Sequence, residues 1–257
     1  MRLLLTLLAF AGSLAASQSH FEKTVDRYYN DRFQYFPSEA TADGFHQWDA
    51  KLEDYSAGAR QARVAMDRRY LAEFLQFPAT SDRDLMISHI NADLLDAEDI
   101  RSWERDPDWY SSGVTNSIFQ LISRRFASPE DRLQSVISRE TQIPQVLVEA
   151  RRNLKNPPRI YTQVALEQLP GIVSFFEKDV PAAFPTVRDP SLQHRVQQVN
   201  QAAVAALKSY ENFLKTDLLN RSRGEFAIGA ENYRKKLAYD EMVDIPLDRL
   251  LQIGFDN

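Results

Sequence analysis

The sequence predicts an all-α fold, an irregular array of long antiparallel helices with at most a short extended segment near 223–230. Apolar residues recur at three- and four-residue steps along most of the chain, which is the period of an amphipathic helix. No stretch alternates apolar and polar residues convincingly over the length of a strand. The chain has only 8 glycines among 257 residues, whereas turn-rich β folds need glycine at many positions of positive φ.

Prolines and capping residues divide the chain into the expected helices. Pro37 ends the first helix, Ser56 and Ser81 are N-caps, and Ser128 caps a helix that has Pro129 at its first position. We expect helices over residues 21–36, 56–77, 81 to before Pro107, 113–126, 129 onward, 141–154, 161–178 and 189–219. The segment 37–55 is expected to be irregular.

Two helices have apolar faces that can be predicted residue by residue. In the helix that starts at Ser81, the residues expected to face inward are Leu85, Ile87, Ile90, Leu94 and Ala97. In 189–219 the expected stripe is Val196, Val199, Ala203, Ala206, Tyr210, Phe213 and Leu214.

Residues 1–17 are predicted to be a secretory signal peptide, followed by one helical domain over 18–257. Arg2 precedes an apolar run, Leu3–Ala11, which is too short to cross a bilayer, and small residues follow it. The sequence has no cysteine, so we expect neither disulfides nor a lipid-anchored mature form. The predicted protein is exported, periplasmic or secreted, without a stable membrane anchor.

The charge distribution disfavours nucleic acid as a partner. The formal net charge is −5, and pairs such as Arg68-Arg69 and Arg151-Arg152 are scattered along the sequence and flanked by acidic residues. A surface that binds phosphates needs its basic residues on one face.

The sequence offers no convincing catalytic or metal site. None of the 4 histidines is followed by glutamate, as the helical zinc motif H-E-x-x-H requires. His89, Asp93 and Asp96 share one helix face at ligand-like spacing, but a solvated polar face is the favoured interpretation. The acidic pairs Glu98-Asp99 and Asp240-Glu241 are expected to be exposed, which disfavours acid–base roles. We therefore assign no catalytic residue and no metal ligand.

Three motifs in order give the chain a family resemblance. They are P-x-x-A-T-x-x-G-x-H (Pro37, Ala40, Thr41, Gly44, His46), N-L-x-x-P-P-x-x-x-T (Leu154, Pro157, Thr162) and G-x-x-x-Y-x-x-x-L (Gly229, Tyr233, Leu237). With them the chain resembles the N-terminal half of the domain-of-unknown-function 885 family. These exported bacterial proteins are similar to zinc metallopeptidases of the gluzincin type.

The resemblance implies a protein of two halves, with the zinc-binding H-E-x-x-H helix and a glutamate ligand in the C-terminal half. Zinc is then expected only in that missing half, and this chain is an inactive scaffold that meets a peptide substrate only together with it. Phe226, Gly229 and Tyr233 are candidate cleft-lining residues, because irregular segments between helices often edge a site. The alternative is a non-catalytic exported helical module that binds a peptide or protein, so enzyme status stays open.

Overall fold

The computed structural model describes residues 19–256, and within this range every regular element is a helix. The prediction of an all-α fold is therefore confirmed, and 223–229 contains neither a helix nor a strand. The predicted signal peptide, 1–17, lies outside the described residues.

The elements follow one another as short and long helices. In chain order they are helix 19–32, α2 (Pro37–Ala42), the 3-10 turn η1 (His46–Trp48), α3 (Ala57–Phe74), α4 (Ser81–Leu94), the π-helical η2 (Leu95–Ile100), α5 (Ser102–Arg105), α6 (Pro107–Ser123), α7 (Pro129–Asn153), α8 (Arg159–Ser174), the π-helical η3 (Phe175–Asp179), α9 (Val180–Ala182), α10 (Pro190–Phe213), the π-helical η4 (Leu214–Leu218), α11 (Leu219–Arg221), α12 (Ala230–Asp240) and α13 (Leu247–Asp256).

The chain divides into two compact units, each described here by itself. Unit 1 combines the described part of Met1–Gln34 with Gln61–Asp99 and the described part of Gly229–Asn257, and unit 2 combines Tyr35–Arg60 with Ile100–Ile228.

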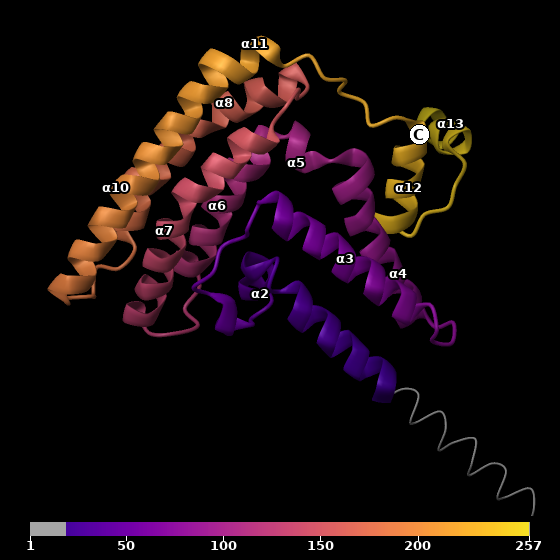
Figure 1. The fold of residues 1–257 in the computed structure, drawn as a ribbon, viewed down its shortest axis with the longest axis horizontal. Coiled ribbons are helices and arrows are strands. Elements are labelled where there is room, and N and C mark those ends of the chain that lie inside the picture. The colour runs from indigo at the N-terminus through magenta and orange to yellow at the C-terminus, as the bar shows by residue number, and fades with distance from the viewer. Residues whose placement is uncertain (1–18, 257) are drawn as a thin grey trace, which may run out of the picture. The chain divides into compact units, whose positions relative to one another are not determined.

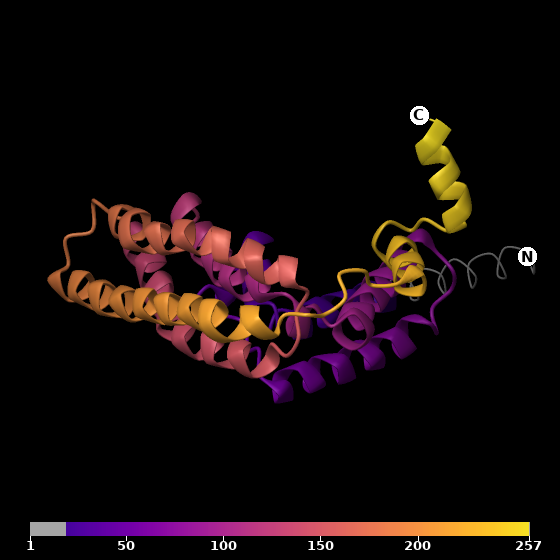
Figure 2. The same ribbon diagram turned by 90° about the horizontal axis from the view of Figure 1, so that it is seen from above.

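Unit 2 is a helical array in which α7 packs against both α6 and α10, and α8 packs against α6 (Figures 1 and 2). Ile118, Leu147, Leu169 and Leu207 contribute one core side chain from each of these helices, and none is more than 1% exposed. Burying each such side chain stabilises the fold by roughly 1.5–3 kcal/mol.

Unit 1 is built around aromatic side chains. The rings of Phe21 and Tyr28 on helix 19–32 contact the ring of Phe74 on α3, at centroid distances of 5.7 and 6.1 Å. The Ser88 hydroxyl on α4 lies 2.9 Å from the carbonyl oxygen of Tyr239, which ties α12 to α4. Figure 2 shows α13 projecting away from the other helices of this unit.

The structure corrects several predicted boundaries. Helices end before Pro37 and Pro107, as predicted, but each proline also begins a new helix, α2 or α6, because proline is tolerated where the first helical N–H groups have no partner. The cap of α4 is Thr80 rather than Ser81, since the Thr80 hydroxyl accepts from the N–H of Arg83 at 3.2 Å. The predicted helices from 129 and over 141–154 are one continuous helix, α7, which does begin with the expected Ser128 cap.

The predicted apolar faces are partly confirmed. Val196, Ala203, Tyr210 and Leu214 of the predicted stripe are buried in unit 2. Leu85, in contrast, is 56% exposed, and its neighbour Met86 is buried instead. The prediction for Leu85 was wrong by one position because Met86 and Ile90, one turn apart, form the buried stripe of α4.

Candidate functional site

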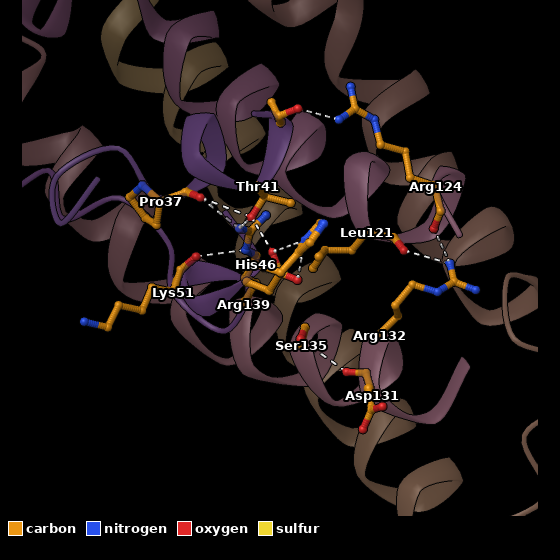
Figure 3. A network of polar contacts seen from close by, with 12 residues as sticks. Pro37, Thr41, His46, Lys51, Leu121, Arg124, Asp131, Arg132, Ser135 and Arg139 are labelled. Atoms are coloured by element: carbon orange, nitrogen blue, oxygen red, sulfur yellow. Dashed lines mark hydrogen bonds and ion pairs between the residues drawn. The ribbon is translucent and has the colours of Figure 1, made fainter. Parts of the chain in front are cut away.

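The most elaborate polar arrangement in unit 2 joins the segment 37–53 to α6 and α7 (Figure 3). It contains Thr41 and His46 of the first sequence motif, on α2 and η1, and it is centred on Arg139 of α7. Arg139 is fully buried although its side chain carries a charge.

The Arg139 guanidinium is consumed by acceptors inside the fold. It donates from Nε to the carbonyl oxygen of Lys51 at 2.8 Å and from Nη1 to that of Ser117 at 2.6 Å. Its Nη2 donates to the Thr41 hydroxyl at 2.6 Å and to the carbonyl oxygen of Pro37 at 3.3 Å. Burial lowers the pKa of Arg139, while the negative charges of Glu53 and Asp49 oppose that shift. One side chain thus holds together α2, the loop after η1, α6 and α7.

A carboxylate and an imidazole complete the arrangement. Asp49 Oδ1 accepts from the Thr41 hydroxyl at 2.7 Å, and Oδ2 lies 3.1 Å from His46 Nδ1. The His46 ring stacks on Phe126 with the centroids 3.8 Å apart and the planes inclined by 9°. His46 is therefore fixed in orientation by a carboxylate on one side and a ring face on the other.

Glu53 pins the start of α2. Its two carboxylate oxygens accept from the backbone N–H and the hydroxyl of Ser38, both at 2.9 Å. Burial raises the pKa of Glu53, and the hydrogen bonds from Ser38 and the charge of Arg139 act against this rise. The adjoining segment 50–52 is held by Gln142 of α7, whose side-chain oxygen accepts a hydrogen bond from the N–H of Leu52 at 3.1 Å.

Chemically, this network is a clamp. The Arg139 guanidinium donates to main-chain carbonyl oxygens and to the Thr41 hydroxyl, and the Asp49 carboxylate contacts Thr41 and His46. A His–Asp pair can orient a general base, but catalysis also requires a reacting group within hydrogen-bond reach. The arrangement holds a polar loop against a helical core.

The second motif performs a similar structural task. Leu154 is buried in the core, and the Thr162 and Ser222 hydroxyls lie 2.8 Å apart. The carbonyl oxygen of Pro157 accepts from the N–H of Gly224 at 3.0 Å. A Cβ at Gly224 would lie 2.2 Å from the carbonyl oxygen of Asn156, so only glycine allows this close approach.

The ligand-like trio in unit 1 is not a solvated face. Asp93 forms an ion pair with the buried Arg32 of helix 19–32, so this face of α4 turns toward another helix. His89 lies beside Tyr28, with ring centroids 6.2 Å apart. No group of three His, Cys, Asp or Glu residues that could hold a metal ion occurs in the part of the chain that the structure describes. The expectation of a solvated polar face was wrong because Arg32 contributes a buried counter-charge.

The three candidate cleft-lining residues fall in different units. Phe226 belongs to unit 2, is 63% exposed and lies edge-on to the ring of Tyr161 at 5.5 Å. Gly229 and Tyr233 belong to unit 1, where Gly229 has φ +87° at the start of α12 and Tyr233 is 46% exposed. Their role as a shared cleft stays a prediction.

Sequence reasoning missed Glu140, the neighbour of Arg139 on α7. Glu140 is fully buried, its Oε1 accepts from Asn200 Nδ2 at 2.9 Å, and burial raises its pKa to about 7. Asn200 also donates to the carbonyl oxygen of Phe176 at 2.9 Å. The only signal in the sequence is that Glu140 lies three residues from both Ile137 and Ile143, which places its charge on the apolar face of the helix.

Glu98, Asp99, Asp240 and Glu241 are all exposed, which confirms the exposure predicted for the two acidic pairs.

Within 19–256, none of the helices combines the length and apolar character needed to cross a membrane.

Comparisons with known proteins identify one matching bacterial family and one similar solved structure. The sequence model of a family described as bacterial protein of unknown function (DUF885) matches residues 37–257. A solved structure from Shewanella oneidensis, described as "a putative lipoprotein of unknown function", is similar with a TM-score of 0.81 and 26% sequence identity. The similarity covers 91% of this chain but 45% of that chain, so this chain spans less than half the length of that protein. No protein in the curated set matches.

Proposed function

Because the chain belongs to the DUF885 family of bacterial proteins of unknown function, we propose that it is the helical scaffold of an exported protein similar to zinc metallopeptidases. In this proposal the zinc-binding and catalytic residues lie outside residues 1–257, and the chain alone is inactive. The resemblance of its three motifs to the N-terminal half of the family motivates the assignment.

The proposal rests on the structural roles that the motif residues have in the fold. Thr41 and His46 are tied to Arg139 and Asp49 in the interior clamp, and Pro157 and Thr162 hold the segment after α11. The residues present do not fit a zinc site, because Asp93, the central member of the His89, Asp93 and Asp96 trio, is paired with Arg32. Motif residues that hold the fold together in this way fit a scaffold.

The length of the Shewanella oneidensis neighbour supports a larger protein. More than half of that chain lies outside the similarity, which leaves room for a second part of comparable size. We propose that such a part carries the reaction.

The apolar face of α13 is the surface on which we expect that second part to dock. Leu251 and Phe255 are 59% and 77% exposed, and Met242 and Ile245 in the preceding segment are also exposed. An exposed apolar stripe of this kind on one helix commonly marks an interaction site. We expect the docking partner to be an apolar helical surface from the remainder of a family protein.

Export rests on two supporting observations. The N-terminal residues have the composition of a signal peptide, and the description of the Shewanella oneidensis neighbour names a lipoprotein. We propose a periplasmic or secreted location for this chain.

The proposal is tested by assaying the purified chain, residues 18–257, for zinc content and for hydrolysis of a mixed peptide library with and without added zinc. We expect no stoichiometric zinc and no zinc-dependent cleavage. Zinc-dependent cleavage by the homogeneous chain would refute the scaffold assignment.

A second candidate function is a non-catalytic exported module that binds a peptide or protein. The observation that favours it is an exposed apolar group in unit 2, made of Ile160 and Val164 on one face of α8 and Phe226 against Tyr161. The genomic DNA beyond codon 257 discriminates the two. An open frame that encodes H-E-x-x-H supports the scaffold, whereas an in-frame stop and a monomer that melts cooperatively support the binding module.

A further inference from the structure

Asp67 of α3 occupies an unusual position in unit 1. The residue is 0% exposed, and neither of its carboxylate oxygens accepts a hydrogen bond from any described residue. A buried ionised carboxylate without hydrogen bonds is costly by several kcal/mol, and proteins commonly avoid this by neutralising the group.

The charged groups around Asp67 do not remove this cost. The charges of Arg63 on α3 and of Arg32 on helix 19–32 oppose the rise in the pKa of Asp67, but Arg32 is already paired with Asp93 of α4. Tyr28 on helix 19–32 also interacts with Asp67, and its hydroxyl is 3.4 Å from Arg32 Nη1. The ring of His89 on α4 lies beside the ring of Tyr28. Asp67 and Asp93 therefore both interact with the charge of Arg32, but only Asp93 is hydrogen-bonded to it.

We propose that Asp67 is a buried proton-binding site that couples the closure of unit 1 to pH. With a proton on the carboxyl group, helix 19–32, α3 and α4 pack around a neutral side chain. Loss of the proton places a second negative charge beside Asp93 in the interior, and the unit opens more often to let water reach it. This inference is independent of the proposed scaffold function.

The direction of the effect follows from the two states. Burial, reinforced by the charge of Asp93, raises the pKa of Asp67 from 3.8 to about 7. A raised folded-state pKa means that the contribution to stability is fully present below about pH 4 and is lost as pH rises through about 7. Unit 1 should accordingly be more tightly closed at pH 6 than at pH 8.

Hydrogen exchange of the full chain, followed by mass spectrometry at pH 6 and pH 8 after scaling for intrinsic exchange rates, tests the proposal locally. For peptides from 61–74 we expect the opening equilibrium to rise about tenfold between the two pH values, because this is the linkage expected for a folded pKa near 7. The variant Asp67→Asn should lose this pH dependence, whereas the control Asp84→Asn, an exposed carboxylate on α4 paired with Arg83, should retain it. Equal protection of 61–74 at both pH values in the unmodified chain would overturn the proposal.

A second measurement covers the case in which Asp67→Asn does not fold. The infrared spectrum of the unmodified chain at pH 6 should contain the carbonyl band of a protonated carboxyl group that disappears on titration to pH 8. Burial also raises the pKa of Glu53 and Glu140 in unit 2, and both can contribute a similar band, so the spectrum is compared in the Glu53→Gln, Glu140→Gln background. Absence of a titrating band in that background would also overturn the proposal.

Discussion

Replacing Arg139 by methionine tests whether the interior clamp holds unit 2 together. Methionine fills a similar volume with an apolar side chain, so the change removes the guanidinium and leaves the packing space occupied. The carbonyl oxygens of Lys51 and Ser117 and the Thr41 hydroxyl each lose their donor.

The expected magnitude follows from what remains behind. Hydrogen bonds from a charged donor contribute about 1.5–3 kcal/mol each, but neighbouring groups relax, so the contributions do not add fully. Asp49 also stays buried without its nearby positive charge. Removing one partner of a buried charged arrangement costs about 3–5 kcal/mol, and we expect Arg139→Met to lower the free energy of unfolding by that amount.

Urea denaturation followed by tryptophan fluorescence measures this change selectively. The 3 tryptophans, Trp48, Trp103 and Trp109, all belong to unit 2. The matched control is Arg152→Met on the same helix, because the Arg152 side chain is 67% exposed and forms an ion pair with Glu149. The control should cost no more than about 1 kcal/mol.

The reasoning is refuted if the two arginine variants lose equal stability. Should Arg139→Met fail to fold, Arg139→Lys provides the measurement. Lysine keeps the charge but lacks the planar fork that reaches several acceptors, so an intermediate loss is expected, and no loss at all would contradict the clamp.

Three further changes test separate features of unit 2. Gly224→Ala should cost about 1–3 kcal/mol in urea denaturation because its Cβ meets the Asn156 carbonyl oxygen, whereas the control Gly171→Ala meets no atom within 4 Å and should not destabilise. The stability of unit 2 should fall by roughly 2 kcal/mol between pH 5 and pH 8, because burial raises the pKa of Glu140 to about 7 and the fold is favoured only while this carboxyl group is protonated. Glu140→Gln should flatten this pH dependence, and an unchanged slope would contradict the reasoning. Ser128→Ala removes the side chain that accepts from the N–H of Asp131 at 3.1 Å and should cost about 1 kcal/mol in the same assay, a loss that Ser135→Ala on the same helix should not reproduce.

The sequence was sufficient for the fold class because apolar periodicity is a local property. The stripe from Val196 to Leu214 on α10 and η4 could be read directly, since burial follows the helical period there. Helix boundaries at proline were harder to predict. Pro37 and Pro107 begin helices, yet a proline just after a helix looks the same in the sequence.

The interior clamp could not be predicted for a different reason. Arg139 and Glu140 are charged residues on an amphipathic helix, and such residues normally lie in solvent. Their burial depends on partners distant in the chain, with Thr41 lying 98 residues from Arg139 and Asn200 lying 60 residues from Glu140. Only the tertiary structure brings these donors and acceptors together.

Two of the buried acids, Asp67 and Glu140, share one physical feature. Each lies in a different unit, each is fully buried, and burial raises the pKa of each to about 7. Raised pKa values can indicate catalytic acids, but structural networks produce them as well. A catalytic acid must reach its substrate, whereas these two carboxyl groups are enclosed by helices of their own units. We therefore expect their protonation to act on the packing of the helices around them.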